Sequence, residues 1–159
     1  MSPVRIAIGS DEKTALTDAV KAWLREQGHE VVAFGALRDG EREVDWPLVG
    51  AAVGRAVADA TVDQGVVCCW TGTGVSMAAN KVPGVRAALC SDAETARGAR
   101  IYNHANVLVL SLRATSEAVA REVLQAWFST SLSDDAWNRE QIGRIADLDR
   151  ARSEPSGKV

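Results

Sequence analysis

The chain has 159 residues, of which 47% are hydrophobic and 5% aromatic, and 18 Lys and Arg against 21 Asp and Glu give a net charge of −3. This composition is typical of one soluble globular domain. No apolar run approaches the ~18 residues of a membrane span, and the first residues lack the pattern of a signal peptide. Lys and Arg are scattered, which disfavours a nucleic-acid-binding protein. We therefore expect a small soluble enzyme or binding module that engages neither membranes nor nucleic acids.

The number and spacing of the cysteines disfavour disulfide bonds and metal binding. Cys68, Cys69 and Cys90 are odd in number, and they form neither a Cys-x-x-Cys pair nor a set with the spacing of zinc ligands. We expect no disulfide framework, no metal site and a location in the reducing cytoplasm.

Short apolar runs alternate along the chain with segments whose apolar residues have the spacing of a helix. Strands are expected over residues 4–8, 30–34, 65–69, 86–90 and 107–110. Helices are expected between residue 16 and Gly28, over 48–60, 73–81 and 92–101, and after a capping Ser116. This alternation predicts a doubly wound, Rossmann-like α/β fold, in which helices cover both faces of a five-stranded parallel sheet.

The C-terminal part stands apart from this alternation. One more helix is expected over residues 137–150, and we interpret it as an arm that packs at a dimer interface. The prediction is thus a single domain over residues 1–152, followed by a flexible tail over 153–159 that contains proline and glycine.

The end of the third strand carries the richest candidate chemistry. Cys69 ends a buried strand, and Gly72 and Gly74 form a turn that opens a helix. Backbone N–H groups and the positive end of a helix dipole favour a thiolate and can hold an oxyanion. This pairing suits removal of a proton next to a carbonyl group. The alternative is that Cys69 is an ordinary buried side chain.

Other strand and helix ends supply candidates for substrate binding, each with a structural alternative. Asp11 and Asp45 are placed to bind sugar hydroxyls or to cap helices. Asn103, just before the fifth strand, is a candidate oxyanion donor or a turn residue. Arg113, after that strand, is a candidate anion contact or a solvated surface residue.

The motifs together resemble the type B ribose-5-phosphate isomerase and galactose-6-phosphate isomerase family. The resemblance rests on Asp11, on residues 44–47 (VDWP), on residues 65–81 (GVVCCWTGTGVSMAANK), on residues 84–87 (GVRA) and on residues 103–108. It implies a Rossmann-like homodimer or higher oligomer with its active site between subunits, which interconverts aldose and ketose phosphates without a cofactor or metal.

The resemblance also assigns roles to individual residues. It implies that Cys69 shuttles the proton between C1 and C2 and that Thr71 assists with its hydroxyl group. The substrate-binding candidates are Asp11, Glu12, Asp45, Trp70, Gly72, Thr73, Gly74, Tyr102, Asn103, Arg113 and Trp137.

Several of these positions depart from the family pattern. Glu12 and Tyr102 stand where the family has histidines, the second of which opens the sugar ring. Trp70 replaces a glycine, and Trp137, Asn138 and Gln141 replace the arginines and histidine that hold the phosphate. We therefore expect an isomerase of unusual specificity, acting on ribose 5-phosphate or a shorter sugar phosphate. The rival hypotheses are an isomerase of an unphosphorylated or acid sugar, and a family member that binds a sugar without catalysis.

Overall fold

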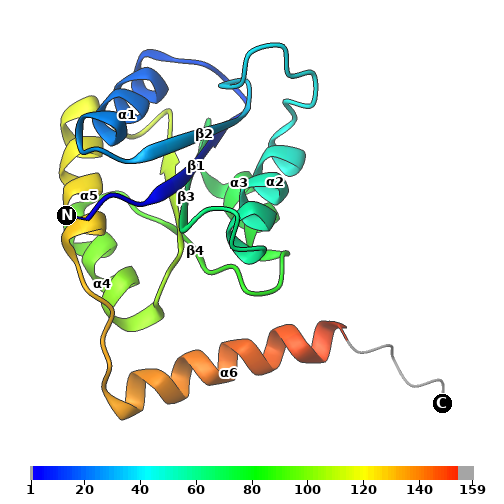
Figure 1. Ribbon diagram of the computed structural model, residues 1–159, viewed down its shortest axis with the longest axis vertical. Coiled ribbons are helices and arrows are strands. Elements are labelled where there is room, and N and C mark those ends of the chain that lie inside the picture. Colours follow the sequence, from blue (N-terminus) through cyan, green and yellow to red (C-terminus); the bar gives the residue numbers. More distant parts are fainter. Residues whose placement is uncertain (1, 154–159) are drawn as a thin grey trace.

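The computed structural model describes residues 2–153 and shows alternating strands and helices (Figure 1). The strands are β1 (Arg5–Ser10), β2 (Glu30–Gly35), β3 (Gln64–Cys69), β4 (Ala87–Leu89) and β5 (Val107–Ser111). The helices are α1 (Ala15–Glu26), α2 (Trp46–Ala58), α3 (Thr73–Asn80), α4 (Ala93–Asn103), α5 (Glu117–Ser129) and α6 (Ala136–Ser153). The predicted order of elements is confirmed.

The five strands form one parallel sheet in the order β2-β1-β3-β5-β4. The chain leaves β1 toward β2 on one side and returns to β3 on the other side. Such a reversal opens a crevice at the carboxyl ends of the two strands, which is the usual ligand position in doubly wound sheets. Here it lies beyond Ser10 and Cys69.

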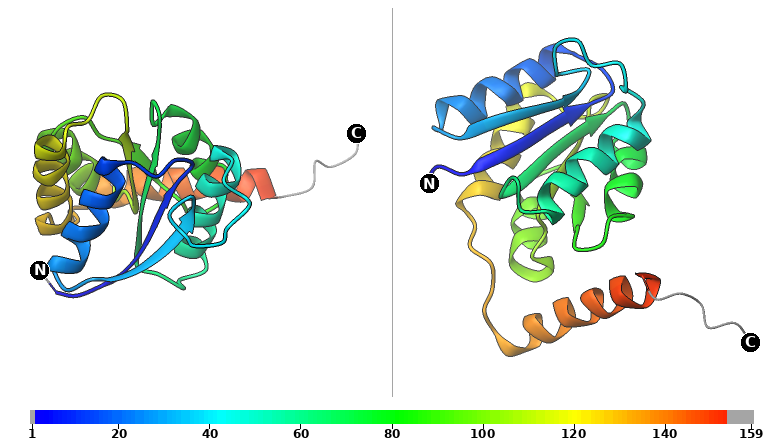
Figure 2. Two further views of the ribbon diagram at one scale, coloured as in Figure 1. Left: turned by 90° about the horizontal axis from the view of Figure 1, so that it is seen from above. Right: turned by 45° about the vertical axis from the view of Figure 1, so that its right-hand side comes forward.

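Helices cover both faces of this sheet, as Figures 1 and 2 show. Helices α1, α4 and α5 pack on one face and bury a core that includes Ile8, Leu108 and Trp127. Helices α2 and α3 pack on the other face around Val53, Val67 and other side chains. The predicted doubly wound α/β fold is therefore confirmed.

Two boundaries differ from the sequence prediction for identifiable reasons. Helix α4 extends to Asn103 because His104 adopts a left-handed conformation (φ 46°) and its N–H bonds to Ala99 O. Tyr102 and Asn103 therefore belong to a helix, not to the loop before β5. Strand β4 is shorter than expected, because the N–H of Arg86 donates to the Asn106 side chain.

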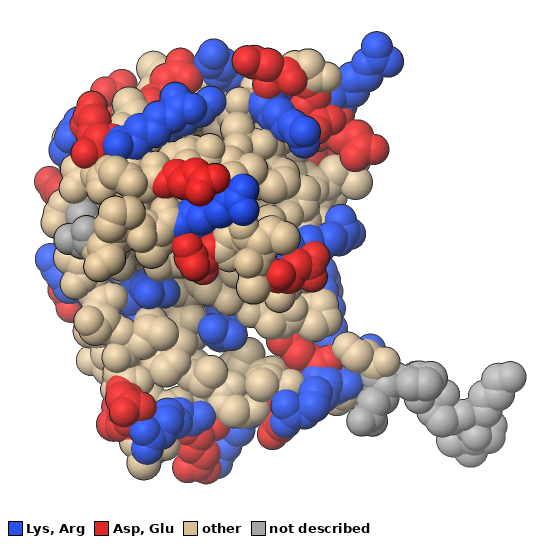
Figure 3. Space-filling view, viewed as in Figure 1, with Lys and Arg blue, Asp and Glu red and all other residues tan. Residues whose placement is uncertain are grey.

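The C-terminal helix is longer than predicted and lies beside the α/β body. It spans 18 residues, and the views in Figure 2 show it running past the end of the sheet. The space-filling view shows mixed positive and negative side chains along it and a hollow between it and the body (Figure 3). None of the helices among residues 2–153 is both long enough and apolar enough to span a bilayer. Most of the predicted tail, residues 154–159, lies outside the described residues.

Candidate active site

A cleft of about 330 Å³ lies at the carboxyl ends of β1 and β3. Eight residues line it: Asp11, Trp46, Cys69, Trp70, Thr71, Thr73, Gly74 and Met77. They come from the loop after β1, the start of α2, the end of β3 and the first turns of α3. The topology thus joins segments up to 66 residues apart (77 − 11) at one edge of the sheet.

Cys69 ends β3 and lines this cleft, whereas its neighbour Cys68 is buried on the opposite face. Strand geometry sends adjacent side chains to opposite faces, so Cys68 packs with α1, α4 and α5 and Cys69 packs with α2 and α3. Burial raises the pKa of Cys68 to about 12. Cys90 also packs in that first core, and burial raises its pKa to about 12. Of the three thiols, the one at the cleft is that of Cys69.

The glycine turn gives the cleft its backbone donors. Gly72 is the N-cap of α3 and has φ +77°, a conformation that strains any residue with a Cβ. Because no side chain caps α3, the N–H groups of its first turn are left for a ligand. The hydroxyl oxygens of Thr71 and Thr73 lie 2.7 Å apart and form a hydrogen bond beside this turn. The arrangement suits an oxyanion.

Asp11 brings a carboxylate to the same cleft. It does not cap α1, because Thr14 does so through its side chain. Its Oδ1 atom is buried and has no hydrogen-bond partner in the structure. Burial raises the pKa of Asp11, the nearby Glu12 adds to this rise, and backbone N–H groups oppose it. A buried oxygen without a partner in a cleft is available to a substrate hydroxyl.

Trp46 and Met77 line the cleft but were absent from the sequence candidates. A feature of the sequence could have placed each of them in the cleft. Trp46 begins α2, and helices that follow parallel strands begin at the carboxyl edge of the sheet. Met77 lies four residues after Thr73, and residues with this spacing share one face of a helix.

The remaining candidates lie outside this cleft within one protomer. Asp45 is the N-cap residue of α2 but makes no capping hydrogen bond with its side chain. Glu12 is exposed, and its N–H donates to Ser10 Oγ. Arg113 is exposed after β5, and its N–H donates to the carbonyl oxygen of Trp70. Trp137 is 64% exposed near the start of α6.

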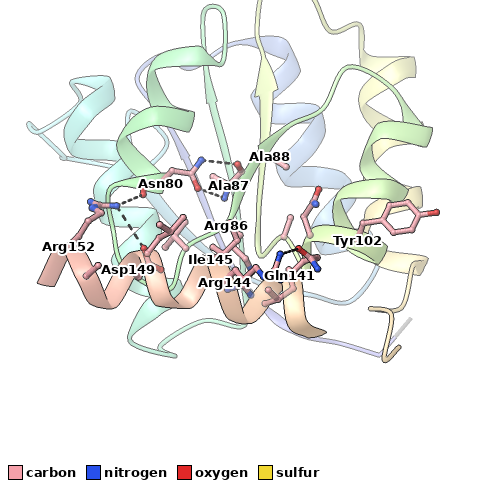
Figure 4. A pocket seen from close by; sticks show the side chains of 16 residues that line it. Asn80, Arg86, Ala87, Ala88, Tyr102, Gln141, Arg144, Ile145, Asp149 and Arg152 are labelled. Carbon is pink, nitrogen blue, oxygen red and sulfur yellow. Dashed lines mark hydrogen bonds and ion pairs between the residues drawn. The ribbon is translucent and has the colours of Figure 1, made fainter. Parts of the chain in front are cut away.

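Tyr102 and Asn103 line a second and larger hollow of about 840 Å³, between α6 and the body (Figure 4). Its other walls include Arg86, Ala87, Ile145 and Leu148. Although larger than the cleft, it contains no thiol and no glycine turn. The two candidates are thus separated from Cys69 within one protomer.

No group of three His, Cys, Asp or Glu residues in the range 2–153 could hold a metal ion.

A family model described as Ribose/Galactose Isomerase matches residues 6–145. The chain belongs to this family. Ribose-5-phosphate isomerase B of Escherichia coli (strain K12) is 31% identical over 150 residues, which are 94% of this chain and 99% of that protein. D-Erythrulose-4-phosphate isomerase of Pectobacterium atrosepticum is 34% identical over 123 residues, which are 77% of this chain and 80% of that protein.

A solved member of the ribose/galactose isomerase family has the same fold. The structure of Clostridium thermocellum ribose-5-phosphate isomerase B has a TM-score of 0.86 and 35% identity, covering 94% of this chain and 99% of that one. The sequence resemblance is confirmed, and the protein is an isomerase of this family.

Proposed function

We propose that this isomerase interconverts an aldose and a ketose phosphate through a cis-enediolate, with Cys69 as the base. The observation that carries the proposal is one cleft that holds the Cys69 side chain beside the uncapped first turn of α3. A base and preorganised donors at one site are what proton transfer next to a carbonyl requires.

The reaction proceeds by proton transfer alone. The Cys69 thiolate removes a proton from the carbon next to the carbonyl, and the electron pair of that C–H bond forms the C=C bond of the enediolate. The N–H groups after Gly72 and the Thr71 hydroxyl stabilise the oxyanion. The thiol then returns the proton to the neighbouring carbon, while a proton moves between the two oxygens. No external oxidant or reductant is needed.

The substrate in this proposal is ribose 5-phosphate or a related short-chain sugar phosphate. Relatives named for a five-carbon and a four-carbon substrate support this class. The free oxygen of Asp11 binds a sugar hydroxyl, and Arg113, next to Trp70, binds the phosphate. No Lys or Arg lines the cleft itself. That observation favours a second candidate, an isomerase of an unphosphorylated sugar.

We propose a homodimer, in which the partner subunit supplies substrate-binding side chains that the cleft of one protomer lacks. Tyr102, Asn103 and Trp137 lie outside the cleft of their own protomer. Ile145 and Leu148 on α6 are 42% and 62% exposed beside the larger hollow, although they are apolar. A second copy packed there would cover these apolar side chains. Because all three thiols are free, we place the enzyme in a reducing cytoplasm.

Solvent deuterium exchange tests the proposal. Sugar phosphates and free sugars of four to six carbons are incubated in heavy water with the wild type, with Cys69→Ala and with Cys90→Ala as a matched control. We expect exchange at C1 or C2 with the wild type and with Cys90→Ala, and a rate at least about 100-fold lower with Cys69→Ala. Exchange into free sugars alone favours the second candidate. No exchange from a folded wild type refutes catalysis and leaves a sugar-binding protein.

A further inference from the structure

Trp70 occupies a fixed position at the edge of the cleft. It directly follows β3, and its carbonyl oxygen accepts hydrogen bonds from the N–H of Arg113 (2.9 Å) and from Ser111 Oγ (3.0 Å). Ser111 ends β5, the neighbouring strand, and Arg113 lies two residues after it. These two bonds hold the peptide against the sheet and so set the point from which the indole extends.

The indole is exposed although its surface is largely apolar. Of the eight Trp, Tyr and Phe residues, four are exposed: Trp46, Trp70, Tyr102 and Trp137. Trp70 and Trp46 line the cleft and are 58% and 43% exposed. An exposed aromatic side chain next to the proposed base offers a surface on which a ligand can pack.

The indole also reduces the volume of the cleft that is available to a substrate. Trp70 stands beside Cys69 and Thr71 in a cleft of only about 330 Å³, and Trp46 and Met77 supply two more bulky walls. The reacting carbons of a bound sugar must lie at the Cys69 thiol. Because Cys69 is 5% exposed and Trp70 is 58% exposed, the end of a longer sugar chain extends from the buried thiol toward the open side of the cleft, which the indole lines. A short substrate reacts without this conflict.

We infer that Trp70 is a specificity-determining residue, whose indole shortens the cleft and selects four-carbon over six-carbon sugar phosphates. The inference rests on the proposed isomerase function and adds to it the residue that sets chain length. Trp70 takes no part in proton transfer. Its removal changes which substrates reach the thiol, not how the proton moves.

The test compares kcat/KM for D-erythrulose 4-phosphate, ribose 5-phosphate and galactose 6-phosphate. The variants are Trp70→Phe, Trp70→Leu and Trp70→Ala, with Leu132→Ala as the control because Leu132 is exposed outside the cleft. We expect the ratio of four-carbon to six-carbon activity to fall as the side chain shrinks, by about tenfold or more in Trp70→Ala. Trp70→Phe, which keeps an aromatic ring, shows the smallest fall, and Leu132→Ala keeps the ratio of the wild type. The graded series remains informative if the alanine variant does not fold.

The outcomes separate this inference from the proposed function. A wild type that isomerises a sugar phosphate, with ratios unchanged to within about twofold across the series, overturns the role of Trp70 and leaves the isomerase function standing. Loss of the dimer in Trp70→Ala with an unchanged ratio also overturns it, because the indole would then belong to an interface. A folded wild type that turns over no substrate refutes both.

Discussion

The indole of Trp46 lies against the backbone of Gly74. A Cβ built on Gly74 would come within 2.8 Å of Trp46 Cε3 and within 3.0 Å of Cδ2. These distances are shorter than van der Waals contact, so the first turn of α2 and the first turn of α3 can meet only where residue 74 has no side chain. The contact fixes one wall of the cleft beside Cys69.

Gly74→Ala tests this contact. The added methyl group must displace the indole or the first turn of α3, where the oxyanion donors lie. We expect kcat/KM to fall by about 10–100-fold, as small misplacements of catalytic groups do. Steady-state kinetics and a thermal melt measure the effect.

Gly143→Ala is the matched control for that variant. A Cβ there meets no atom within 4 Å, and the residue lies inside α6. We expect full activity and a gain of about 0.5–1 kcal/mol in stability. Equal activity of the two variants would show that the Trp46 contact does not shape the site.

Asp11→Asn is expected to stabilise the protein and weaken catalysis. Burial raises the pKa of this carboxyl, so its ionised form is disfavoured in the folded state. A group of this kind stabilises the fold below its unfolded pKa, and that contribution is lost as the pH rises through the folded pKa. The variant should therefore melt higher than the wild type at pH 7, with a smaller difference near pH 4.

The same substitution removes a charged acceptor for a substrate hydroxyl, which should lower kcat/KM by about 10–100-fold. Asp39→Asn, in an exposed loop, should change neither quantity. Unchanged kcat/KM in Asp11→Asn would remove Asp11 from the site.

The buried thiols of Cys68 and Cys90 predict a loss of stability in alkali. Their pKa values are raised to about 12 by burial, so above pH 9 the unfolded chain loses these protons while the folded chain keeps them. The free energy of unfolding must then fall with pH, by up to about 1.4 kcal/mol per pH unit for each thiol. Urea titrations between pH 8 and 11 measure the slope.

The double variant Cys68→Ala with Cys90→Ala should show a shallower slope over that range. Mass spectrometry offers an independent check, because iodoacetamide should label these two thiols only after unfolding. Rapid labelling of either thiol in the native protein would contradict their burial.

Asp149 and Arg152 of helix α6 form hydrogen bonds with the body, and a substitution of either residue removes them. Asp149 Oδ2 accepts a hydrogen bond from the N–H of Gly84 (2.8 Å), and Arg152 donates to the carbonyl oxygen of Lys81 (2.9 Å) (Figure 4 draws Asp149 and Arg152). We expect Asp149→Ala or Arg152→Ala to weaken docking by about 1 kcal/mol each. Faster amide hydrogen exchange in α6 reports the change.

Arg150→Ala is the control for these variants. Its ion pair with Asp147 lies within α6 and is exposed, so docking should be unaffected. Equal exchange in all three variants would mean that apolar contacts alone hold the helix.

Much of the fold and half of the site follow from local sequence. Alternating strand and helix periods determine the doubly wound sheet, because each pattern fixes which face of an element is buried. The group from Cys69 to Gly74 is contiguous, so its chemistry could be interpreted before its surroundings were known. Positions that depend on contacts with distant segments could not be predicted in this way. Trp46 meets Gly74 only because α2 and α3 pack on the same face of the sheet.

The sequence by itself therefore determined the order of elements, the thiol, the glycine turn and the membership of the family. Only the tertiary structure decided that Asp11 and Trp46 join Cys69 in the cleft and that Tyr102 and Asn103 lie apart from it beside α6. The physical reason is that strand order, here β2-β1-β3-β5-β4, is set by contacts between distant segments. Hydrophobic periodicity determines which face of each element is buried, but not which elements become neighbours.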